Sequence, residues 1–267
     1  SHGARGNMMA AFLAKRTGLP TVSTVHSDYR LDYLGRPLSR ITYGTINTIA
    51  LRKLDYRIGV SDAMVDLLID RRFDPERIFA IYNGLDFTPR TPSMDRATFF
   101  RSVGLDADDT CVVAGIAARL NPVKDIATLI RGFARAHAEY PPLRLLIAGD
   151  GEEMESLKKL AADLGVAKEV CFAGWVSDTD SFYHALDINT LTSISETFPY
   201  VLTEGARAGL PTISSKVGGV SYLIDHGANG FLFTPGDDRA LANHLLTLAR
   251  DPALRKAMGH KLYEKAK

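Results

Sequence analysis

Short apolar runs alternate with longer amphipathic segments along most of the chain. The short runs are rich in β-branched residues and predict strands at residues 21–26, 56–60, 78–82, 111–118, 143–149, 169–173, 187–192, 211–215 and 231–233. Apolar residues at helical spacing predict helices at 6–17, 38–54, 62–71, 125–139, 152–164, 178–184, 199–208, 220–225, 237–250 and 252–265. Strands that alternate with helices predict right-handed βαβ units, and so an α/β protein with parallel sheets covered by helices on both faces.

A polar, proline-containing stretch at residues 86–95 interrupts this alternation. Pro89 and Pro92 lie within four residues of each other, as is typical of a linker. We therefore predict two Rossmann-like, doubly wound domains, at residues 1–90 and 91–267. Only three predicted strands precede the linker, and the sequence does not begin with Met. We expect the first domain to be truncated, without its initial βα units.

Composition narrows the class of protein. The chain has 267 residues, of which 46% are hydrophobic and 24% charged, as in ordinary globular proteins. The longest apolar runs fall well short of the roughly 20 residues that span a bilayer. Cys111 and Cys171 lie in strand-like runs, which indicates buried free thiols and fits a reducing cytoplasm.

Charge is distributed unevenly. Residues 1–90 hold 13 basic and 9 acidic residues, whereas residues 91–267 hold 19 and 22. This mild imbalance is not the footprint of a nucleic-acid-binding protein. A basic first part would suit an anionic surface or acceptor, and a surface imbalance without function would look the same.

Two basic residues, Arg119 and Lys124, follow the predicted strand 111–118. Ligands bind at the carboxyl ends of strands in doubly wound sheets. Two cations there could neutralise a diphosphate, although a solvated loop would have the same composition. Asp125 is placed to cap the helix that follows.

The loop after the strand 187–192 carries a second group of candidates. Pro199 suits the first turn of the next helix and Thr197 could cap it, which would direct free N–H groups at an anion. Glu196 lies just before that helix and Glu204 within it, and carboxylates accept hydrogen bonds from sugar hydroxyls. The alternative is that Glu196 complements the helix dipole and Glu204 lies on the surface.

Glycines follow two other predicted strands. Gly218 and Gly219 would let the backbone approach a ligand closely. The segment Ala148-Gly149-Asp150-Gly151 predicts a tight turn between strand and helix. Met154 stands where a dinucleotide-binding motif requires its third glycine, which disfavours a nicotinamide site.

Three further polar groups lie at element ends. His26 would emerge at the ligand edge of its strand, and His2 has a similar position with less context. A lone histidine is more often structural than functional. Asp178 and Asp180 form the D-x-D pattern of metal-dependent transferases of another fold, but they fall at a predicted helix start. We interpret them as ordinary helix-capping residues.

Together these segments resemble glycosyltransferase family 4, a retaining family with the GT-B fold of two Rossmann-like domains. The resemblance is carried, in the family's order, by Thr24-Val-His26, Asn83-Gly84-Leu85-Asp86, the loop from Arg119 to Lys124, Ala148-Gly149-Asp150-Gly151, the pair Glu196 and Glu204, Ala208-Gly-Leu-Pro211, Gly218-Gly219 and Asn229-Gly230-Phe231. Any single motif is weak, whereas the ordered set is specific.

The resemblance implies roles for individual residues. Arg119 and Lys124 would hold the diphosphate of a sugar nucleotide, and Glu204 would bond the ribose hydroxyls. Glu196 and His26 would reach the donor sugar, and Trp175 lies where the family's backbone meets the base. The residues implied in catalysis are His26, Arg119, Lys124 and Glu196. Those implied in donor binding are Arg119, Lys124, Trp175, Glu196, Thr197, Phe198, Pro199, Tyr200, Val201 and Glu204.

The sequence departs from the family in two ways. Ser221-Tyr222 stands where the family often has a Glu shortly after its double glycine. The glycine-rich loop near the family's N-terminus and its last helix, which crosses back to the first domain, have no counterpart in this sequence. We therefore expect that this chain alone could bind a nucleotide without turnover.

The resemblance implies a retaining glycosyltransferase of the hexosyltransferase type, which moves a sugar from a UDP- or GDP-sugar to a hydroxyl acceptor in cell-surface glycan or glycolipid synthesis. It implies no metal cofactor and no nucleic-acid partner. The enzyme would be cytoplasmic or peripheral at the inner face of the membrane, where its basic first part could meet a lipid-linked acceptor. The alternatives are a GT-B sugar-nucleotide epimerase, a non-catalytic sugar-nucleotide-binding protein and, less favoured, a nicotinamide oxidoreductase.

Overall fold

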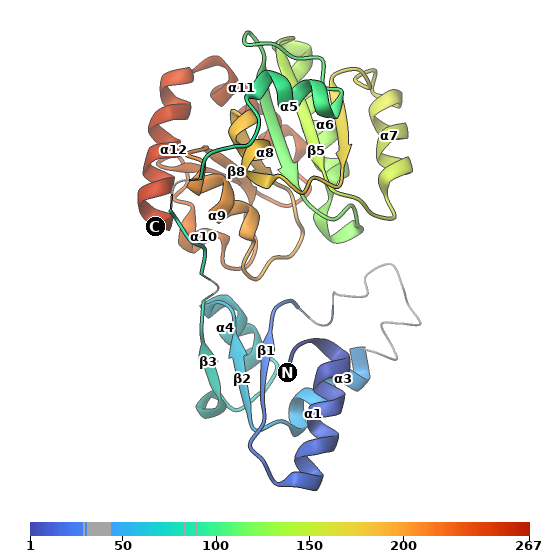
Figure 1. Ribbon diagram of the computed structural model, residues 1–267, viewed down its shortest axis with the longest axis vertical. Helices are drawn as coiled ribbons and strands as arrows, with labels where there is room; N and C mark the ends of the chain where they lie inside the picture. The colour runs from blue at the N-terminus through green and yellow to red at the C-terminus, as the bar shows by residue number, and fades with distance from the viewer. Residues whose placement is uncertain (29, 31–43, 83, 89) are drawn as a thin grey trace. The chain divides into compact units, whose positions relative to one another are not determined.

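The computed structural model describes residues 1–28, 30, 44–82, 84–88 and 90–267 (Figure 1). In it the chain forms two β-sheets, each with parallel strands, together with the helices that connect those strands. Two compact units can be distinguished. The first comprises Ser1–Gly84 with Ser195–Phe198 and Gly218–Val220, and the second comprises Leu85–Ile194, Pro199–Val217 and Ser221–Lys267. Each of the nine predicted strands is present, to within one or two residues at its ends. The predicted fold class is thereby confirmed.

The first unit contains a three-stranded parallel sheet in the order β1-β2-β3. Its elements are α1 (Gly3–Thr17), β1 (Val22–Val25), α3 (Thr45–Lys53), β2 (Tyr56–Gly59), α4 (Asp62–Asp70), the 3₁₀ turn η2 (Pro75–Arg77) and β3 (Ile78–Ala80). Leu51, Met64 and Leu68 are almost fully buried in its core. The first part of the helix predicted at 38–54, and Asn83 of the family motif, lie outside the described residues.

The second unit contains a six-stranded parallel sheet in the order β6-β5-β4-β7-β8-β9. Its strands are β4 (Val112–Ala117), β5 (Leu143–Ala148), β6 (Val170–Gly174), β7 (Ile188–Leu191), β8 (Thr212–Ser215) and β9 (Gly230–Phe233). Its helices are α5 (Arg96–Val103), the 3₁₀ turn η3 (Pro122–Lys124), α6 (Ile126–Glu139), α7 (Met154–Asp163), α8 (Thr179–Ala185), α9 (Tyr200–Arg207), α10 (Val220–Leu223), α11 (Asp238–Arg250) and α12 (Pro252–Ala266). The chain order reverses between β4 and β7, and an open α/β sheet binds its ligand at such a switch point.

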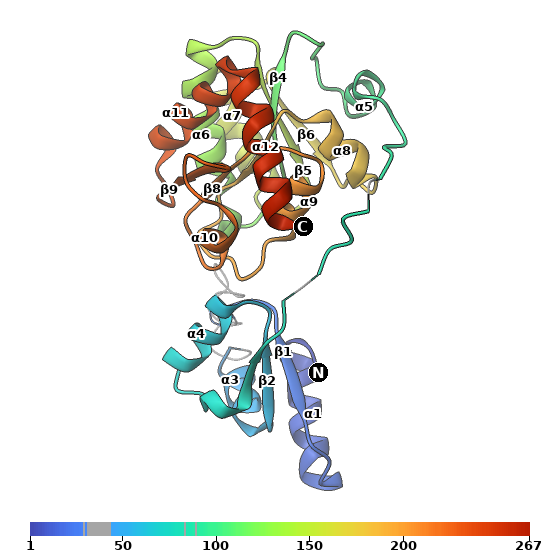
Figure 2. The same cartoon turned by 90° about the vertical axis from the view of Figure 1, so that its left-hand side faces the viewer.

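Both faces of this sheet are covered, because successive side chains of a strand point to opposite faces. Ala114 and Ile116 of β4 belong to a core that includes Phe133 of α6. Val113, directly before Ala114, belongs to a second core with Phe99 of α5 and Phe182 of α8. Figure 2 shows α6, α7 and α11 on one side of the strands and α5 and α8 on the other. The continuously apolar strand β4 is therefore buried on both sides.

Helix α5 was not predicted from the sequence. Its signals are present at both ends: a side-chain oxygen of Asp95 accepts a hydrogen bond from the Thr98 N–H, and Gly104 ends the helix at φ 74°. The helix has only eight residues and its buried Phe99 and Phe100 are adjacent, so helical spacing of apolar positions is hard to recognise. Within the described part of the chain, no helix is long and apolar enough to cross a membrane.

Candidate functional site

The loop from Ala118 to Asp125 continues the pairing of β4 with β5 beyond the ends of both strands. The Ala118 N–H donates to the carbonyl oxygen of Ala148 at 2.9 Å, and the Leu120 N–H donates to that of Asp150 at 2.9 Å. Arg119 lies between these two anchored residues. Its backbone is therefore fixed at the carboxyl edge of the sheet.

Two glycines allow this close approach. A Cβ atom on Gly149, which has φ 129°, would lie 1.9 Å from the Ala118 carbonyl oxygen. A Cβ on Gly151 would lie 2.1 Å from the Leu120 carbonyl oxygen. The tight turn predicted here is present, since α7 begins soon afterwards at Met154. The glycines serve the neighbouring loop rather than a dinucleotide motif.

The other flank of the loop is held by the end of β7. Thr192 Oγ1 donates to the carbonyl oxygen of Lys124 at 2.9 Å. The Ile194 N–H donates to the Val123 carbonyl oxygen at 2.9 Å. Asp125 caps α6 as predicted, with its side chain accepting a hydrogen bond from the Thr128 N–H. Arg119 and Lys124 thus belong to one segment fixed between β5 and β7.

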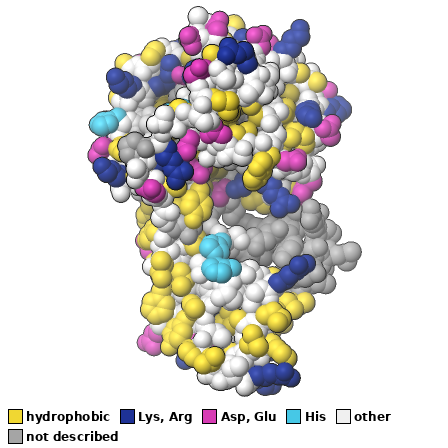
Figure 3. Space-filling model, viewed as in Figure 1, with side chains coloured by type: hydrophobic (Ala, Val, Ile, Leu, Met, Phe, Trp, Pro, Cys, Tyr) yellow, Lys and Arg dark blue, Asp and Glu magenta, His cyan; other side chains and the backbone are white. Residues whose placement is uncertain are grey.

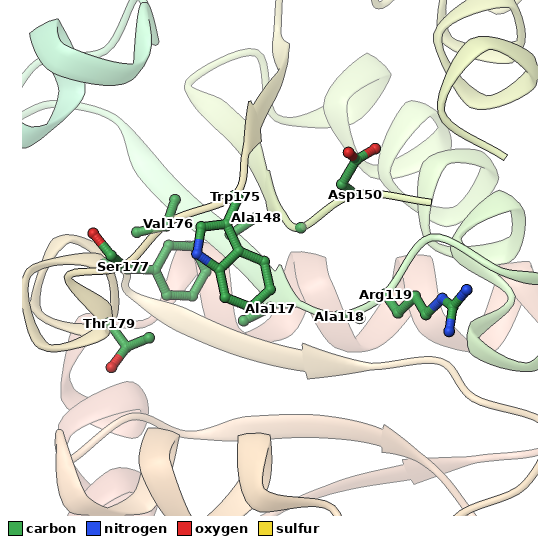
Figure 4. A pocket seen from close by; sticks show the side chains of 11 residues that line it. Ala117, Ala118, Arg119, Ala148, Asp150, Trp175, Val176, Ser177 and Thr179 are labelled. Carbon is green, nitrogen blue, oxygen red and sulfur yellow. The ribbon is translucent and has the colours of Figure 1, made fainter. Parts of the chain in front are cut away.

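A pocket of about 660 Å³ opens at the carboxyl ends of β4, β5 and β6 (Figure 4). It is lined by Ala117, Ala118, Arg119, Ala148, Gly149, Asp150, Trp175, Val176, Ser177, Thr179 and Phe182. Two residues predicted for the site, Arg119 and Trp175, therefore share one pocket. Its volume lies in the range of about 300–1,000 Å³ that is usual for small-molecule sites.

Both of these side chains are accessible. Trp175 is 83% exposed, which is unusual for a large aromatic residue. The Arg119 side chain is 65% exposed, and its Nη2 atom lies 3.8 Å from Glu152 Oε2. An exposed ion pair of this length is weak. Figure 4 shows the guanidinium group of Arg119 extending away from the Trp175 ring. The pocket therefore has an aromatic wall at one side and a cation at the other.

Glu204 lies on α9 and is partly buried. Its Oε2 atom accepts a hydrogen bond of 2.8 Å from the hydroxyl group of Tyr183 on α8. Burial, and secondly the nearby Glu204 carboxylate, raise the pKa of Tyr183 well above its ordinary value. The phenol therefore stays a donor, and Glu204 is held in one orientation.

The predicted start of α9 is wrong in two respects. The helix begins at Tyr200, and Pro199 precedes it with φ −78° and ψ 106° rather than forming its first turn. Thr197 does not cap it, because this extended Pro199 separates Thr197 from the helix; in the described part of the chain no side chain caps α9. Of the other residues predicted here, Phe198 precedes the extended Pro199, and Tyr200 and Val201 form the start of the helix.

Glu196 lies in the segment before Pro199. A Cβ on Gly218, which has φ 46°, would lie 1.8 Å from the Glu196 carbonyl oxygen. The predicted close approach at this glycine is therefore an approach to another loop of the protein. The loops after β7 and β8 are packed backbone to backbone, and Gly218 is required for that packing.

His26 follows β1 in the first unit and pairs with His2. His2 Nδ1 and His26 Nε2 lie 2.9 Å apart, and the two rings are stacked with centroids 5.1 Å apart. Figure 3 shows the histidine side chains of this unit together on its surface. Partial burial, and secondly the neighbouring His2, lower the pKa of His26. The His26 ring is therefore oriented by a neighbouring imidazole.

The two aspartates of the D-x-D pattern have structural partners. A side-chain oxygen of Asp178 accepts a hydrogen bond from the Ser181 N–H and so caps α8, as interpreted from the sequence. Asp180 Oδ1 lies 2.5 Å from Arg207 Nη2 in an ion pair whose Arg207 side chain is 8% exposed. Among the described residues, no group of three or more His, Cys, Asp or Glu side chains is gathered as metal ligands would be.

The structure thus brings some predicted residues together. Arg119 and Trp175 line one pocket, and Lys124 lies on the same anchored loop. Glu204 does not line this pocket and is held by α8, while His26 lies in the first unit. Tyr183 was missed, although a tyrosine on an otherwise apolar helix face must find a partner for its hydroxyl group.

Two parallel-sheet units, the larger with a pocket at the carboxyl edge of its sheet, define a GT-B-type protein. The chain belongs to the family described as glycosyl transferases group 1, whose model matches residues 96–265. The model of Glycosyltransferase Family 4 matches residues 1–88. The resemblance inferred from the motifs is therefore confirmed.

Named relatives and a solved structure are similar over much of the chain. The lipopolysaccharide core biosynthesis glycosyltransferase LpsE of Rhizobium meliloti is 31% identical over 206 residues, which are 77% of this chain and 56% of that protein. D-inositol 3-phosphate glycosyltransferase of Corynebacterium glutamicum is 31% identical over 220 residues, 79% of this chain and 52% of that protein. The crystal structure of Anabaena HepE in complex with UDP-glucose is 26% identical, with a TM-score of 0.85, over 98% of this chain and 71% of that one. The chain thus spans about half the length of these curated relatives.

Proposed function

We propose that the protein is a retaining glycosyltransferase that transfers a hexosyl group from a UDP-sugar to a hydroxyl acceptor. The observation that carries the proposal is the pocket at the carboxyl edge of the larger sheet, in which Arg119 and Trp175 line the same space. A flat base fits beside an exposed indole ring and small alanine side chains, and a diphosphate fits beside a cation. A sugar nucleotide has these two parts.

In this proposal Arg119 and Lys124 hold the diphosphate, and Glu204 accepts hydrogen bonds from the ribose hydroxyl groups. Negative charge grows on the diphosphate as it leaves the sugar, and two cations from one fixed loop stabilise that charge. The acceptor hydroxyl attacks from the face that the diphosphate leaves. A phosphate oxygen of the donor takes its proton, and the anomeric configuration is retained.

Two features of similar proteins support the proposed donor nucleotide and the proposed class of acceptor. HepE was crystallised with UDP-glucose, which favours a uridine donor. LpsE is named for lipopolysaccharide core biosynthesis, which favours an acceptor in a cell-surface glycan. We propose a cytoplasmic enzyme that needs no metal ion for the diphosphate, since Arg119 and Lys124 supply the positive charge.

A membrane-bound acceptor forms part of the same proposal. Met9, Phe12 and Leu13 of α1 are about half exposed, and Lys15 and Arg16 follow them in the last turn. An amphipathic helix with basic residues binds anionic lipid surfaces. The test is co-sedimentation of the protein with phosphatidylglycerol vesicles. We expect the protein to co-sediment at low salt and to be released at high salt. Binding to neutral vesicles alone would contradict an electrostatic contact.

The donor is tested by calorimetry on the full-length protein with UDP, GDP and UDP-glucose. We expect UDP and UDP-glucose to bind and GDP to bind more weakly. Incubation with radiolabelled UDP-glucose and an acceptor should give a glycoside with the donor's anomeric configuration by NMR. An epimerised sugar without transfer would identify an epimerase instead, and binding without turnover would identify a binding protein. Binding of none of these nucleotides would overturn the proposal.

A further inference from the structure

Helix α8 carries a tyrosine whose hydroxyl group reaches the neighbouring helix. Tyr183 is 1% exposed and packs in the second core with Phe182 and Leu186. Its hydroxyl group donates to Glu204 Oε2 at 2.8 Å. A phenylalanine would fill the same apolar space without a buried polar group. The hydroxyl group therefore has its effect at Glu204 rather than in the core.

The backbone of α9 is held independently of this hydrogen bond. Asn189 Nδ2, on β7, donates to the Val201 carbonyl oxygen at 2.9 Å. A Cβ on Gly205 would lie 2.4 Å from Asn189 Nδ2, so the helix touches the strand directly. Loss of the phenol should therefore leave α9 in place and release only the Glu204 side chain.

One carboxylate oxygen of Glu204 remains available. In the part of the chain that the structure describes, Oε1 of Glu204 accepts no hydrogen bond from the protein, whereas Oε2 is engaged by Tyr183. A carboxylate that receives a donor at one oxygen keeps the other for a ligand hydroxyl group. The phenol also selects one orientation from the several that a partly exposed glutamate would otherwise adopt.

We propose that Tyr183 is a positioning residue for donor binding, which holds Glu204 with one carboxylate oxygen directed to the ribose hydroxyl groups. The inference rests on the proposed function, in which Glu204 bonds the ribose. Tyr183 itself does not touch the donor. Burial raises the pKa of the Tyr183 hydroxyl group well above its ordinary value, so the phenol keeps its proton at neutral pH and remains a donor to Glu204.

The test measures how well the protein discriminates between UDP and 2′,3′-dideoxy-UDP. The measure is the dissociation constant of the dideoxy analogue divided by that of UDP. The wild-type protein should bind UDP more tightly, because the dideoxy analogue offers Glu204 nothing to bond. Tyr183→Phe should reduce that ratio about tenfold, the equivalent of roughly one hydrogen bond. Glu204→Gln should reduce it at least as much, and the double variant should show no further loss. Tyr140→Phe, at the residue directly after α6, is the control and should leave the ratio unchanged.

The outcomes separate the inference from the function on which it rests. If Glu204→Gln lowers the ratio and Tyr183→Phe does not, the positioning role is wrong and the ribose role of Glu204 stands. If neither variant lowers the ratio although UDP binds, the roles of both residues are wrong. If the wild-type protein does not bind UDP, the proposed function and this inference both fail. Should Tyr183→Phe not fold, Tyr183→Met makes the same test, because it removes the hydroxyl group, fills the space with an adaptable apolar side chain and leaves Glu204 unchanged.

Discussion

The backbone of Gly149 lies against the carbonyl oxygen of Ala118, at a distance that leaves no room for a side chain. A Cβ on Gly149 would be 1.9 Å from that oxygen. Through this contact, the turn after β5 supports the loop that carries Arg119. The position of Arg119, which is predicted to bind the diphosphate, therefore depends on a glycine in a different turn.

Gly149→Ala should destabilise the protein and displace the Arg119 loop. Alanine is strained at φ 129° and would also collide with backbone, so we expect a loss of about 3–5 kcal/mol in the free energy of unfolding. Gly165→Ala is the control, because Gly165 also has positive φ, at 74°, but no atom lies within 4 Å of an added Cβ. It should cost about 1–2 kcal/mol. Equal losses in urea unfolding would show that the contact with Ala118 is unimportant.

Arg119→Ala and Lys124→Ala should lower turnover more than they weaken donor binding. The charge that these residues meet grows as the diphosphate leaves, so each loss should be about 10²–10³ in kcat by analogy with other positioned donors. The melting temperature should barely change for Arg119→Ala, because that side chain is 65% exposed. Lys159→Ala, an exposed cation on α7, is the control. A collapsed melting temperature with normal activity per folded molecule would make these residues structural.

Donor binding should survive removal of divalent metal. EDTA should leave the affinity for UDP-glucose largely intact, because two basic residues meet the diphosphate. Asp178→Asn should have little effect on affinity or stability, since asparagine caps a helix about as well as aspartate does. Calorimetry with and without magnesium makes the test. Binding that requires magnesium and is abolished by Asp178→Asn would establish the D-x-D pair as a metal site.

The histidine pair should make the first unit sensitive to acid. One ring must donate and the other accept across the 2.9 Å contact, so the bond is lost when both rings are protonated. The pKa of His26 is lowered in the folded state, mainly by burial. The folded state therefore binds this proton less readily, and stability is lost as the pH falls from the unfolded pKa of about 6.5 through the lower folded pKa.

His26→Gln should remove this part of the pH dependence. The measurement is the urea midpoint at several pH values between 7.5 and 5 in wild-type protein and variant. His260→Gln, at an exposed position on α12, should retain the wild-type profile. An unaltered profile in His26→Gln would mean that the pair does not contribute to acid sensitivity.

The sequence predicted the strands well, because each is a short run rich in β-branched or other apolar residues and is bounded by turn residues, although the buried strands β7 and β8 also hold polar residues such as Asn189 and Ser214. Helix α5 was not predicted, because its eight residues hold two adjacent buried phenylalanines rather than apolar residues at helical spacing. Helix caps at Asp125 and Asp178 were predictable because a cap is a local interaction. The cap assigned to Thr197 failed because Pro199 takes an extended backbone between Thr197 and the helix.

The candidate site could be predicted only in part. Arg119 comes after β4 and Trp175 after β6, and both strands are neighbours of β5. The alternation of strands and helices therefore predicts that both residues lie at the same edge of the sheet, but it does not predict that they line one pocket. The bond between Tyr183 and Glu204 joins two helices separated by a strand and a loop, and depends on how α8 packs in the second core and α9 on β7. Similarly, the sequence indicated that Gly149 and Gly218 allow close approach, but not that the approaching atoms belong to the protein itself.

The loop from Ala118 to Asp125 is hydrogen-bonded on one side to the turn after β5 and on the other to the end of β7. Its order is therefore established when the protein folds, before any donor arrives. Ordering a flexible backbone costs about 1–2 kcal/mol per residue at 25 °C, and a loop that is already ordered does not oppose binding with that entropy. A diphosphate should accordingly meet the loop as a rigid, preorganised receptor, with a small entropic penalty from the protein and a fast association that needs no loop closure.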